Sequence, residues 1–145
     1  MSTESSDAPR SVLLDTSVVI ALFQERRRFT LASFERVAIS SLTVAELRLG
    51  VAMAGSADVA RARMAALEET QGLFGTGIPF DDRAAAQYGR ISAHIQRRGG
   101  DPKAHRTDRM IAAIAAAHDL GLVTLNPVDL RGTDELVRVL ASPTA

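Results

Sequence analysis

Two patterns of apolar and polar positions, one typical of strands and one of helices, follow each other along this chain. Short apolar runs predict buried strands, and we expect these at residues 12–15, 37–40, 78–80 and 122–125, with a fifth at 136–140. Longer stretches between them begin at capping residues and end near Gly or Pro, as helices do. We expect helices at residues 18–23, 29–36, 43–54, 56–72, 82–98 and 107–121.

The order of these elements indicates the fold class. Strands that alternate with helices along the chain favour an α/β protein whose parallel sheet is covered on both faces. We therefore predict a three-layer α/β/α sandwich with a central, mainly parallel sheet. Residues 1–10 are polar and predict a short disordered lead. Residues 11–145 then form a single domain.

Composition narrows the function classes. The chain has no cysteine, which excludes disulfides and thiolate metal sites. No apolar run approaches the roughly 20 residues of a membrane span, so we expect a soluble, cytoplasmic protein with no membrane partner. Basic and acidic residues number 17 each, so nucleic acid would have to bind at a local patch. One basic cluster consists of Arg97, Arg98, Lys103, Arg106 and Arg109.

Four polar residues lie at the ends of predicted strands or in the first turns of predicted helices, which the fold brings close together. Asp15 ends the first strand and Asn126 follows the fourth, while Glu46 and Asp108 lie in the first turns of helices. In a doubly wound sheet these places meet at the carboxyl edge of the strands, where open α/β proteins bind ligands. One cleft would then hold three carboxylates and an amide.

Three neighbouring carboxylates repel one another, and a divalent cation relieves this repulsion. Oxygen ligands alone favour Mg²⁺ or Mn²⁺ over zinc. Such an ion activates water and offsets the charge on a phosphodiester during hydrolysis. The pattern is therefore typical of a metal-dependent nuclease.

Each acid also has a structural interpretation. Thr43 and Glu46 have the spacing of a capping box, in which Glu46 only hydrogen-bonds back to the Thr43 N–H. Asp108 is equally a first-turn acid that the helix dipole favours. Asp15 is harder to explain in this way, because it ends a strand expected to be buried on both faces, where an unpaired charge is costly.

Taken together, the motifs around these residues resemble the PIN domain, in particular the VapC and FitB branch of toxin nucleases. The matching segments are LLDTSVVI from Leu13, SSLTVAELRLGVA from Ser40, IPFDDRAAAQYGRI from Ile78 and TDRMIAAIAAAHDLGLVTLNPVDL from Thr107. The resemblance covers most of residues 11–131. It also implies the PIN-like version of the predicted sandwich.

The resemblance implies roles for the site residues. Asp15, Glu46 and Asp108 would organise Mg²⁺ or Mn²⁺, with Asp15 and Asp108 as the firmest ligands. Asn126 is the fourth predicted catalytic residue, but many relatives have an acid at its position. Asp129, three residues later, resembles another common form of the motif. The sequence leaves open which of the two fills the fourth position.

The resemblance further implies an endoribonuclease that is the toxin of a type II toxin-antitoxin system. Its partners would be RNA, a VapB-like antitoxin and a second copy of the chain in a homodimer, with DNA contacted only through the antitoxin. The alternative is a catalytically silent PIN module that binds RNA or a protein. A phosphotransfer enzyme fits less well, because Ser17 stands where haloacid-dehalogenase phosphatases have a second Asp.

Overall fold

The computed structural model describes residues 10–134 and 136–141. They contain a sheet of four strands, β1 (Ser11–Leu14), β2 (Arg36–Ala38), β3 (Gly121–Thr124) and β4 (Val139–Ala141), in the order β2-β1-β3-β4. All three strand pairs are parallel. The central strand β1 pairs Leu13 with Ala38 of β2 and with Leu122 of β3.

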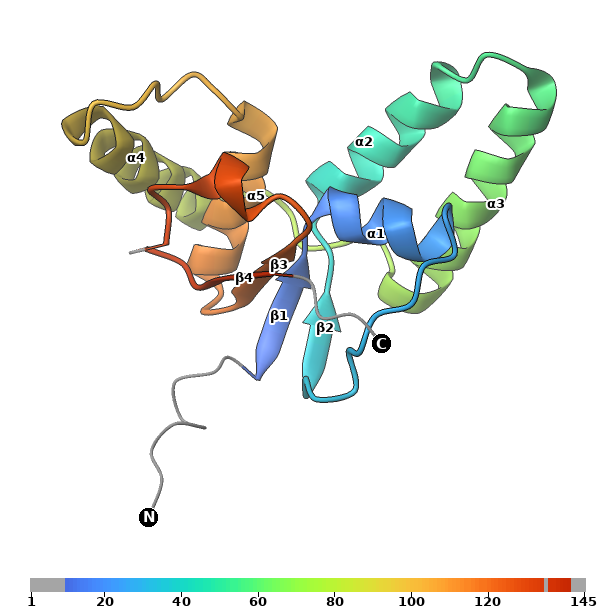
Figure 1. Ribbon diagram of the computed structural model, residues 1–145, viewed down its shortest axis with the longest axis horizontal. Helices are drawn as coiled ribbons and strands as arrows, with labels where there is room; N and C mark the ends of the chain where they lie inside the picture. The colour runs from blue at the N-terminus through green and yellow to red at the C-terminus, as the bar shows by residue number, and fades with distance from the viewer. Residues whose placement is uncertain (1–9, 135, 142–145) are drawn as a thin grey trace.

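Helices surround this sheet. They are α1 (Thr16–Phe23), α2 (Ser41–Ala52), α3 (Ala57–Phe74), α4 (Asp82–Arg97) and α5 (Arg106–Ala117), and a 3₁₀ helix, η2 (Pro127–Leu130), follows β3. Figure 1 shows α2 and α3 as a hairpin that projects to the right beside α1, while α4 and α5 lie together on the left. The structure thus has two helical halves with the sheet between them.

Alternate residues of the central strands face opposite helical layers. Leu13 and Leu122 belong to the core cluster formed with α4 and α5. Val12, Leu14 and Val123 belong to the other cluster, formed with α1, α2 and α3. Side chains alternate between the faces of a strand, and these residues are fully buried. The predicted three-layer α/β/α sandwich with a parallel sheet is confirmed.

Side-chain caps determine where three helices begin. The hydroxyl of Ser40 accepts from Thr43 N, that of Ser56 accepts from Val59 N, and the Asp81 carboxylate accepts from Ala84 N. The hydrogen bond from Ala84 N is the main cause that lowers the pKa of Asp81 below its usual value. The cap at Ser40 starts α2 two residues before the predicted Thr43.

The predicted helix at residues 29–36 is wrong. The chain there is irregular before β2 begins at Arg36. Phe29, Leu31 and Phe34 all pack against the cluster beside α1. Positions 29 and 31 would lie on opposite faces of a helix, so an irregular chain buries these three side chains where a helix could not.

The predicted strand at residues 78–80 is also wrong. Ile78 forms only an isolated parallel bridge with Ser40. Pro79 lacks an N–H and therefore cannot continue a ladder of hydrogen bonds. Among the described residues the sheet consequently has four strands in place of the five expected, and the predicted fifth strand is β4, shifted to Val139–Ala141.

Two expectations concern the whole chain. None of the described helices combines the length and the apolar character that a membrane crossing requires. The predicted lead at residues 1–10 lies, apart from Arg10, outside the described residues. A single domain over residues 11–145 stays a prediction.

Candidate active site

Asp15 lies at the carboxyl edge of the sheet, between β1 and α1. Its side chain is buried, and Oδ2 accepts hydrogen bonds from Ser17 Oγ at 3.0 Å and Thr124 Oγ1 at 2.8 Å. Thr124 ends β3, so this carboxylate links the two central strands. The other oxygen, Oδ1, is buried and has no hydrogen-bond partner within the described part of the chain. A buried acceptor without a partner is rare, and a cation would satisfy it.

Glu46 has no part in a capping box. Because Ser40 caps α2, Thr43 lies inside the first turn and Glu46 lies almost one turn further on. The half-buried Glu46 carboxylate instead accepts a hydrogen bond from Thr16 Oγ1, at the start of α1, at 2.6 Å. The capping interpretation of Glu46 is therefore wrong.

A chain of hydroxyl groups leads to Glu46. Thr16 donates its only hydroxyl proton to Glu46, so in the 2.9 Å contact between the two threonines Thr43 must be the donor to Thr16. Ser40 in turn donates to Thr43 Oγ1 at 3.3 Å. Ser40, Thr43 and Thr16 are buried. This hydroxyl chain, from Ser40 through Thr43 to Thr16, fixes the orientation of the Glu46 carboxylate.

Asp108 lies in the first turn of α5 and is half-buried. Burial raises its pKa to about 6, and repulsion from Asp15, Glu46 and Asp129 adds to the rise, while His105 opposes it. A helix dipole acting alone would have lowered the pKa. The dominant environment of Asp108 is therefore a desolvated cluster of negative charge, as the functional interpretation requires.

The two candidates for the fourth position lie in different surroundings. Asp129, in η2, offers a ligand atom that lies with one atom each from Asp108 and His105 within a mutual distance of 4.8 Å. Asn126 is exposed, and its backbone N–H donates to Thr124 Oγ1 at 3.0 Å. Asp129 is therefore placed with Asp108, whereas in the described part of the chain the Asn126 side chain makes no hydrogen bond to a carboxylate.

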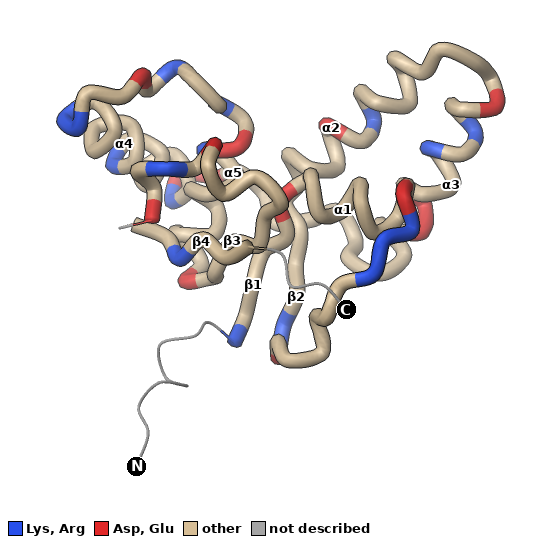
Figure 2. Tube along the Cα trace, viewed as in Figure 1, with Lys and Arg blue, Asp and Glu red and all other residues tan. Residues whose placement is uncertain are grey.

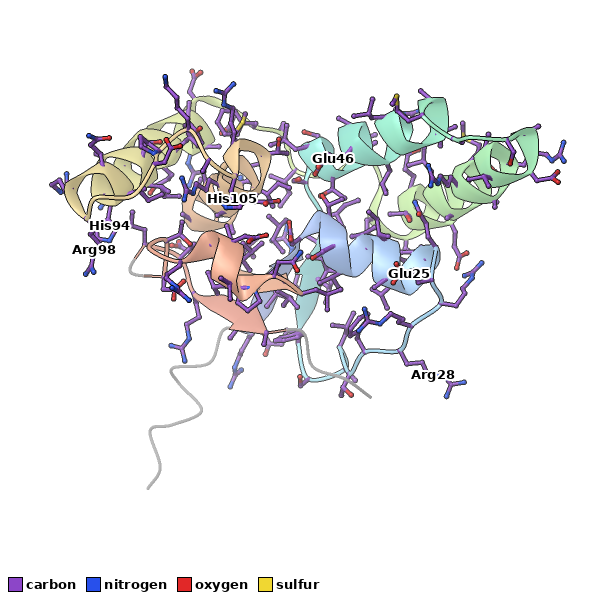
Figure 3. The ribbon with its side chains drawn as sticks, turned by 45° about the horizontal axis from the view of Figure 1, so that its top comes forward. Glu25, Arg28, Glu46, His94, Arg98 and His105 are labelled. Carbon is purple, nitrogen blue, oxygen red and sulfur yellow. The ribbon has the colours of Figure 1, made fainter. Side chains whose placement is uncertain are left out.

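The acidic side chains come from both helical halves of the molecule. Figure 3 shows Glu46 on α2 and His105 at the start of α5. His105 Nδ1 lies 4.0 Å from Asp108 Oδ2, which is too long for a hydrogen bond. The sequence predicted that the carboxylates converge at this edge of the sheet. In the structure, repulsion from Asp15 and Glu46 contributes to the raised pKa of Asp108.

Two hydrogen-bond donors to the carboxylates were not predicted from the sequence. Thr16 and Thr124 each donate to a carboxylate of the cluster, yet neither was singled out. A signal existed for Thr16, which directly follows Asp15. For Thr124 the signal was its place at the end of the predicted 122–125 strand, beside Asp15 at the carboxyl edge, although the two residues lie 109 positions apart in the chain.

The donor set fits a hard divalent cation. The carboxylates of Asp15, Glu46, Asp108 and Asp129 supply oxygen ligands, as Mg²⁺ and Mn²⁺ prefer. Among the described residues, Asp15 Oδ1 is a buried acceptor without a partner. The pKa of Asp108 is raised by burial and, in addition, by repulsion from neighbouring carboxylates, which a cation would relieve. Such a site can support hydrolysis of a phosphodiester.

Comparisons with known proteins agree with this chemistry. A family model described as PIN domain matches residues 12–136. Ribonuclease VapC5 of Mycobacterium tuberculosis is 33% identical over 92% of this chain and 99% of that protein, and Toxin FitB of Neisseria gonorrhoeae is 33% identical over 78% and 86%. The crystal structure of VapBC-5 from M. tuberculosis, of the VapBC family of toxin-antitoxin systems, gives a TM-score of 0.72 at 33% identity over 92% of this chain and 98% of that one. The chain is a member of the PIN-domain family, together with VapC5 and FitB.

Proposed function

We propose that this chain is a metal-dependent endoribonuclease and the toxin of a type II toxin-antitoxin system. The observation that carries the proposal is the convergence of Asp15, Glu46 and Asp129 on Asp108, whose pKa is raised first by burial and further by repulsion from these three carboxylates. The similarity to Ribonuclease VapC5 over 92% of the chain supports RNA as the substrate. The site lies at the carboxyl edge of a parallel sheet, where the fold class places ligands.

Asp15, Asp108 and Glu46 are the proposed ligands of Mg²⁺, with Mn²⁺ as a substitute. Asp129 takes the fourth position in preference to Asn126, because its carboxylate lies with that of Asp108. When bound, the ion supplies an activated water and offsets the charge that develops on the phosphodiester.

The protein's own contribution is to hold these carboxylates in place. Thr124 and Ser17 fix Oδ2 of Asp15 and leave Oδ1 without a donor among the described residues. The hydroxyl chain that ends at Thr16 fixes Glu46. The carboxylates are thus positioned before substrate binds, so little reorganisation accompanies the reaction.

The partners follow from the same assignment. We propose a VapB-like antitoxin as inhibitor, because one solved relative with 33% identity is a member of the VapBC family of toxin-antitoxin systems. DNA would be contacted only through that antitoxin, since the chain's net charge is zero and gives no general attraction to nucleic acid. A homodimer and a cytoplasmic location complete the proposal.

The decisive experiment is RNA cleavage with and without metal. The purified protein should cut RNA with Mg²⁺ or Mn²⁺, stop in EDTA and recover with excess Mg²⁺, because the carboxylates alone cannot activate water. Circular dichroism in EDTA checks that the fold persists. Undiminished cleavage in EDTA would remove the metal mechanism. RNA binding without cleavage under any ion would favour the silent PIN module instead.

A further inference from the structure

A second polar feature lies next to the carboxylates. A cavity of about 310 Å³ opens between the end of α4, the start of α5 and the turn after η2. The described residues that line it are Ile95, Arg98, Gly100, Arg109, Arg131 and Gly132. They include three arginines and no acidic residue, so the cavity is strongly basic.

Arg109 is the least exposed of these arginines. Only 6% of its surface is accessible, and its Nη1 donates to the backbone oxygen of Asp101 at 2.6 Å. Its Nε is buried and has no hydrogen-bond partner in the described residues. A guanidinium that is buried and only partly hydrogen-bonded is costly, and an anion in the cavity would complete its contacts.

Two of these arginines, Arg109 and Arg131, keep their charge without a neutralising partner in the part of the chain that the structure describes. No ion pair there involves Arg109 or Arg131. Arg131 is exposed, whereas Arg109 is held inside the protein. The guanidinium groups of Arg109 and Arg131 thus line one cavity in which no described residue is acidic. Their positive charges repel each other, and a bound anion would relieve this repulsion.

Two glycines shape the cavity. A Cβ atom at Gly100 would come within 2.8 Å of Ile95 Cγ2, so the loop packs closely on the last turn of α4. Gly132 has a φ of +94°, which side-chain-bearing residues rarely adopt. A Cβ atom at Gly132 would lie 3.7 Å from Ile95 Cγ1, so the turn after η2 approaches the end of α4. Ile95 is the apolar side chain in the lining of the cavity.

The cavity and the carboxylates are built from the same two segments. Arg109 directly follows Asp108 in α5, and Arg131 follows Asp129 by two residues. Consecutive Cα atoms are about 3.8 Å apart. Basic positions gather along the end of α4 and the loop to α5 in Figure 2, and Figure 3 shows Arg98 at the end of α4. The cavity therefore borders the segments of α5 and η2 that carry Asp108 and Asp129.

We propose that this arginine cavity binds a backbone phosphate of the RNA, adjacent to the phosphodiester held at the carboxylates. This inference rests on the proposed function, and it adds a substrate-positioning site. Guanidinium groups bind phosphate through paired, charge-assisted hydrogen bonds. Such contacts carry no sequence information and fix the register of the strand.

RNA fits the cavity better than a protein carboxylate does. A backbone phosphate offers several oxygens to Arg109 and Arg131 together, and a strand already seated at the carboxylates delivers its neighbouring phosphate without further loss of translational freedom. The shared segments of α5 and η2 supply that geometry. A partner protein that inserts an acidic side chain is the competing occupant, and the test separates the two.

The test compares Arg131→Gln with Arg36→Gln. Both remove one exposed arginine, but Arg36 begins β2 at the opposite edge of the sheet. Binding of a short fluorescent single-stranded RNA is measured by anisotropy in EDTA, so that no cleavage is needed. Arg131→Gln should weaken binding about tenfold, as the loss of a charge-assisted contact does. It should also lower the salt slope of log K by about 0.7 for the phosphate lost. Arg36→Gln should change neither.

Cleavage under Mg²⁺ gives an independent readout. Arg131→Gln should raise KM with kcat nearly unchanged, because the contact exists equally in ground and transition states. Arg109→Lys, which keeps the charge but loses the paired donors, should raise KM too, after its fold is checked by circular dichroism. Equal weakening by Arg131→Gln and Arg36→Gln would overturn the site, as would unchanged RNA binding with weakened antitoxin binding. Absence of cleavage in the wild type would refute the proposed function and leave the binding result readable.

Discussion

At the scale of single residues, hydroxyl groups decide how the carboxylates point. Thr124 and Ser17 occupy one oxygen of Asp15, and Thr16 occupies one oxygen of Glu46. Each carboxylate therefore keeps a second oxygen for a ligand. Only Ser17 is close in sequence to the acid that it supports; Thr16 and Thr124 lie 30 and 109 positions from theirs. The acids could therefore be predicted from motifs more directly than the hydroxyl groups that orient them.

Asp15→Asn and Asp108→Asn should each abolish RNA cleavage while the fold survives. Each change replaces a charged ligand by a side chain of nearly the same shape, so the packing around β1 and α5 is kept. Cleavage assays and circular dichroism on the same preparations check both halves of the expectation. Loss of structure in either variant would leave its assignment to the site without support.

Glu46→Gln should cut cleavage at limiting Mg²⁺ by at least about tenfold, or about 1.4 kcal/mol of barrier. Gln still accepts the hydrogen bond from Thr16, and one negative charge fewer relieves repulsion in the cluster. The melting temperature should therefore not fall. Glu68→Gln, at an exposed position of α3, is the matched control and should cleave normally. Normal activity of Glu46→Gln would remove Glu46 from the site.

Asp108 should also make stability depend on pH when metal is absent. Its pKa is raised from 3.8 to about 6 in the fold, so the native state binds more protons than the unfolded chain between these values. Stability should fall as pH rises through this window. Asp108→Asn should melt higher than the wild type at neutral pH in EDTA, and the difference should vanish toward pH 4. A difference independent of pH would contradict the raised pKa.

At the scale of elements, local chemistry predicted the helices better than the strands. Caps at Ser56 and Asp81 start α3 and α4 where the sequence indicated. The two wrong predictions of secondary structure lie where tertiary contacts outweigh the local pattern of apolar residues. Residues 29–36 bury apolar side chains without a helix, and Pro79 limits its segment to an isolated bridge.

The cap of α3 provides a test that separates stability from activity. Ser56→Ala removes the hydroxyl that accepts from Val59 N, and it should lower the free energy of unfolding by about 1 kcal/mol. Cleavage should remain unchanged, because Ser56 lies in the α2–α3 turn, away from the carboxyl edge of the sheet. Denaturant unfolding and cleavage assays measure the two effects. A loss of cleavage in the folded variant would mean that this hairpin participates in the reaction.

At the scale of the whole molecule, the topology could be predicted and with it the edge at which the site lies. Alternating strands and helices imply that Asp15 and the end of the 122–125 strand meet. The choice between Asn126 and Asp129 could not be predicted, since it depends on how η2 turns after β3. The arginine cavity could not be predicted from the sequence either. Arg131 stands far in sequence from the basic cluster that contains Arg109, and only the turn at Gly132 unites them.

The hydrogen bond between Asp15 and Thr124 spans 109 residues, and this span has a consequence during protein synthesis. The ribosome synthesises residue 15 more than a hundred residues before β3 and Asp129. A nascent chain, or a translation product that ends before residue 121, holds Asp15 and Glu46 without the strand that completes their edge. An assembled carboxylate edge can therefore form only after β3 has left the ribosome, which is later than the synthesis of Asp15 and Glu46.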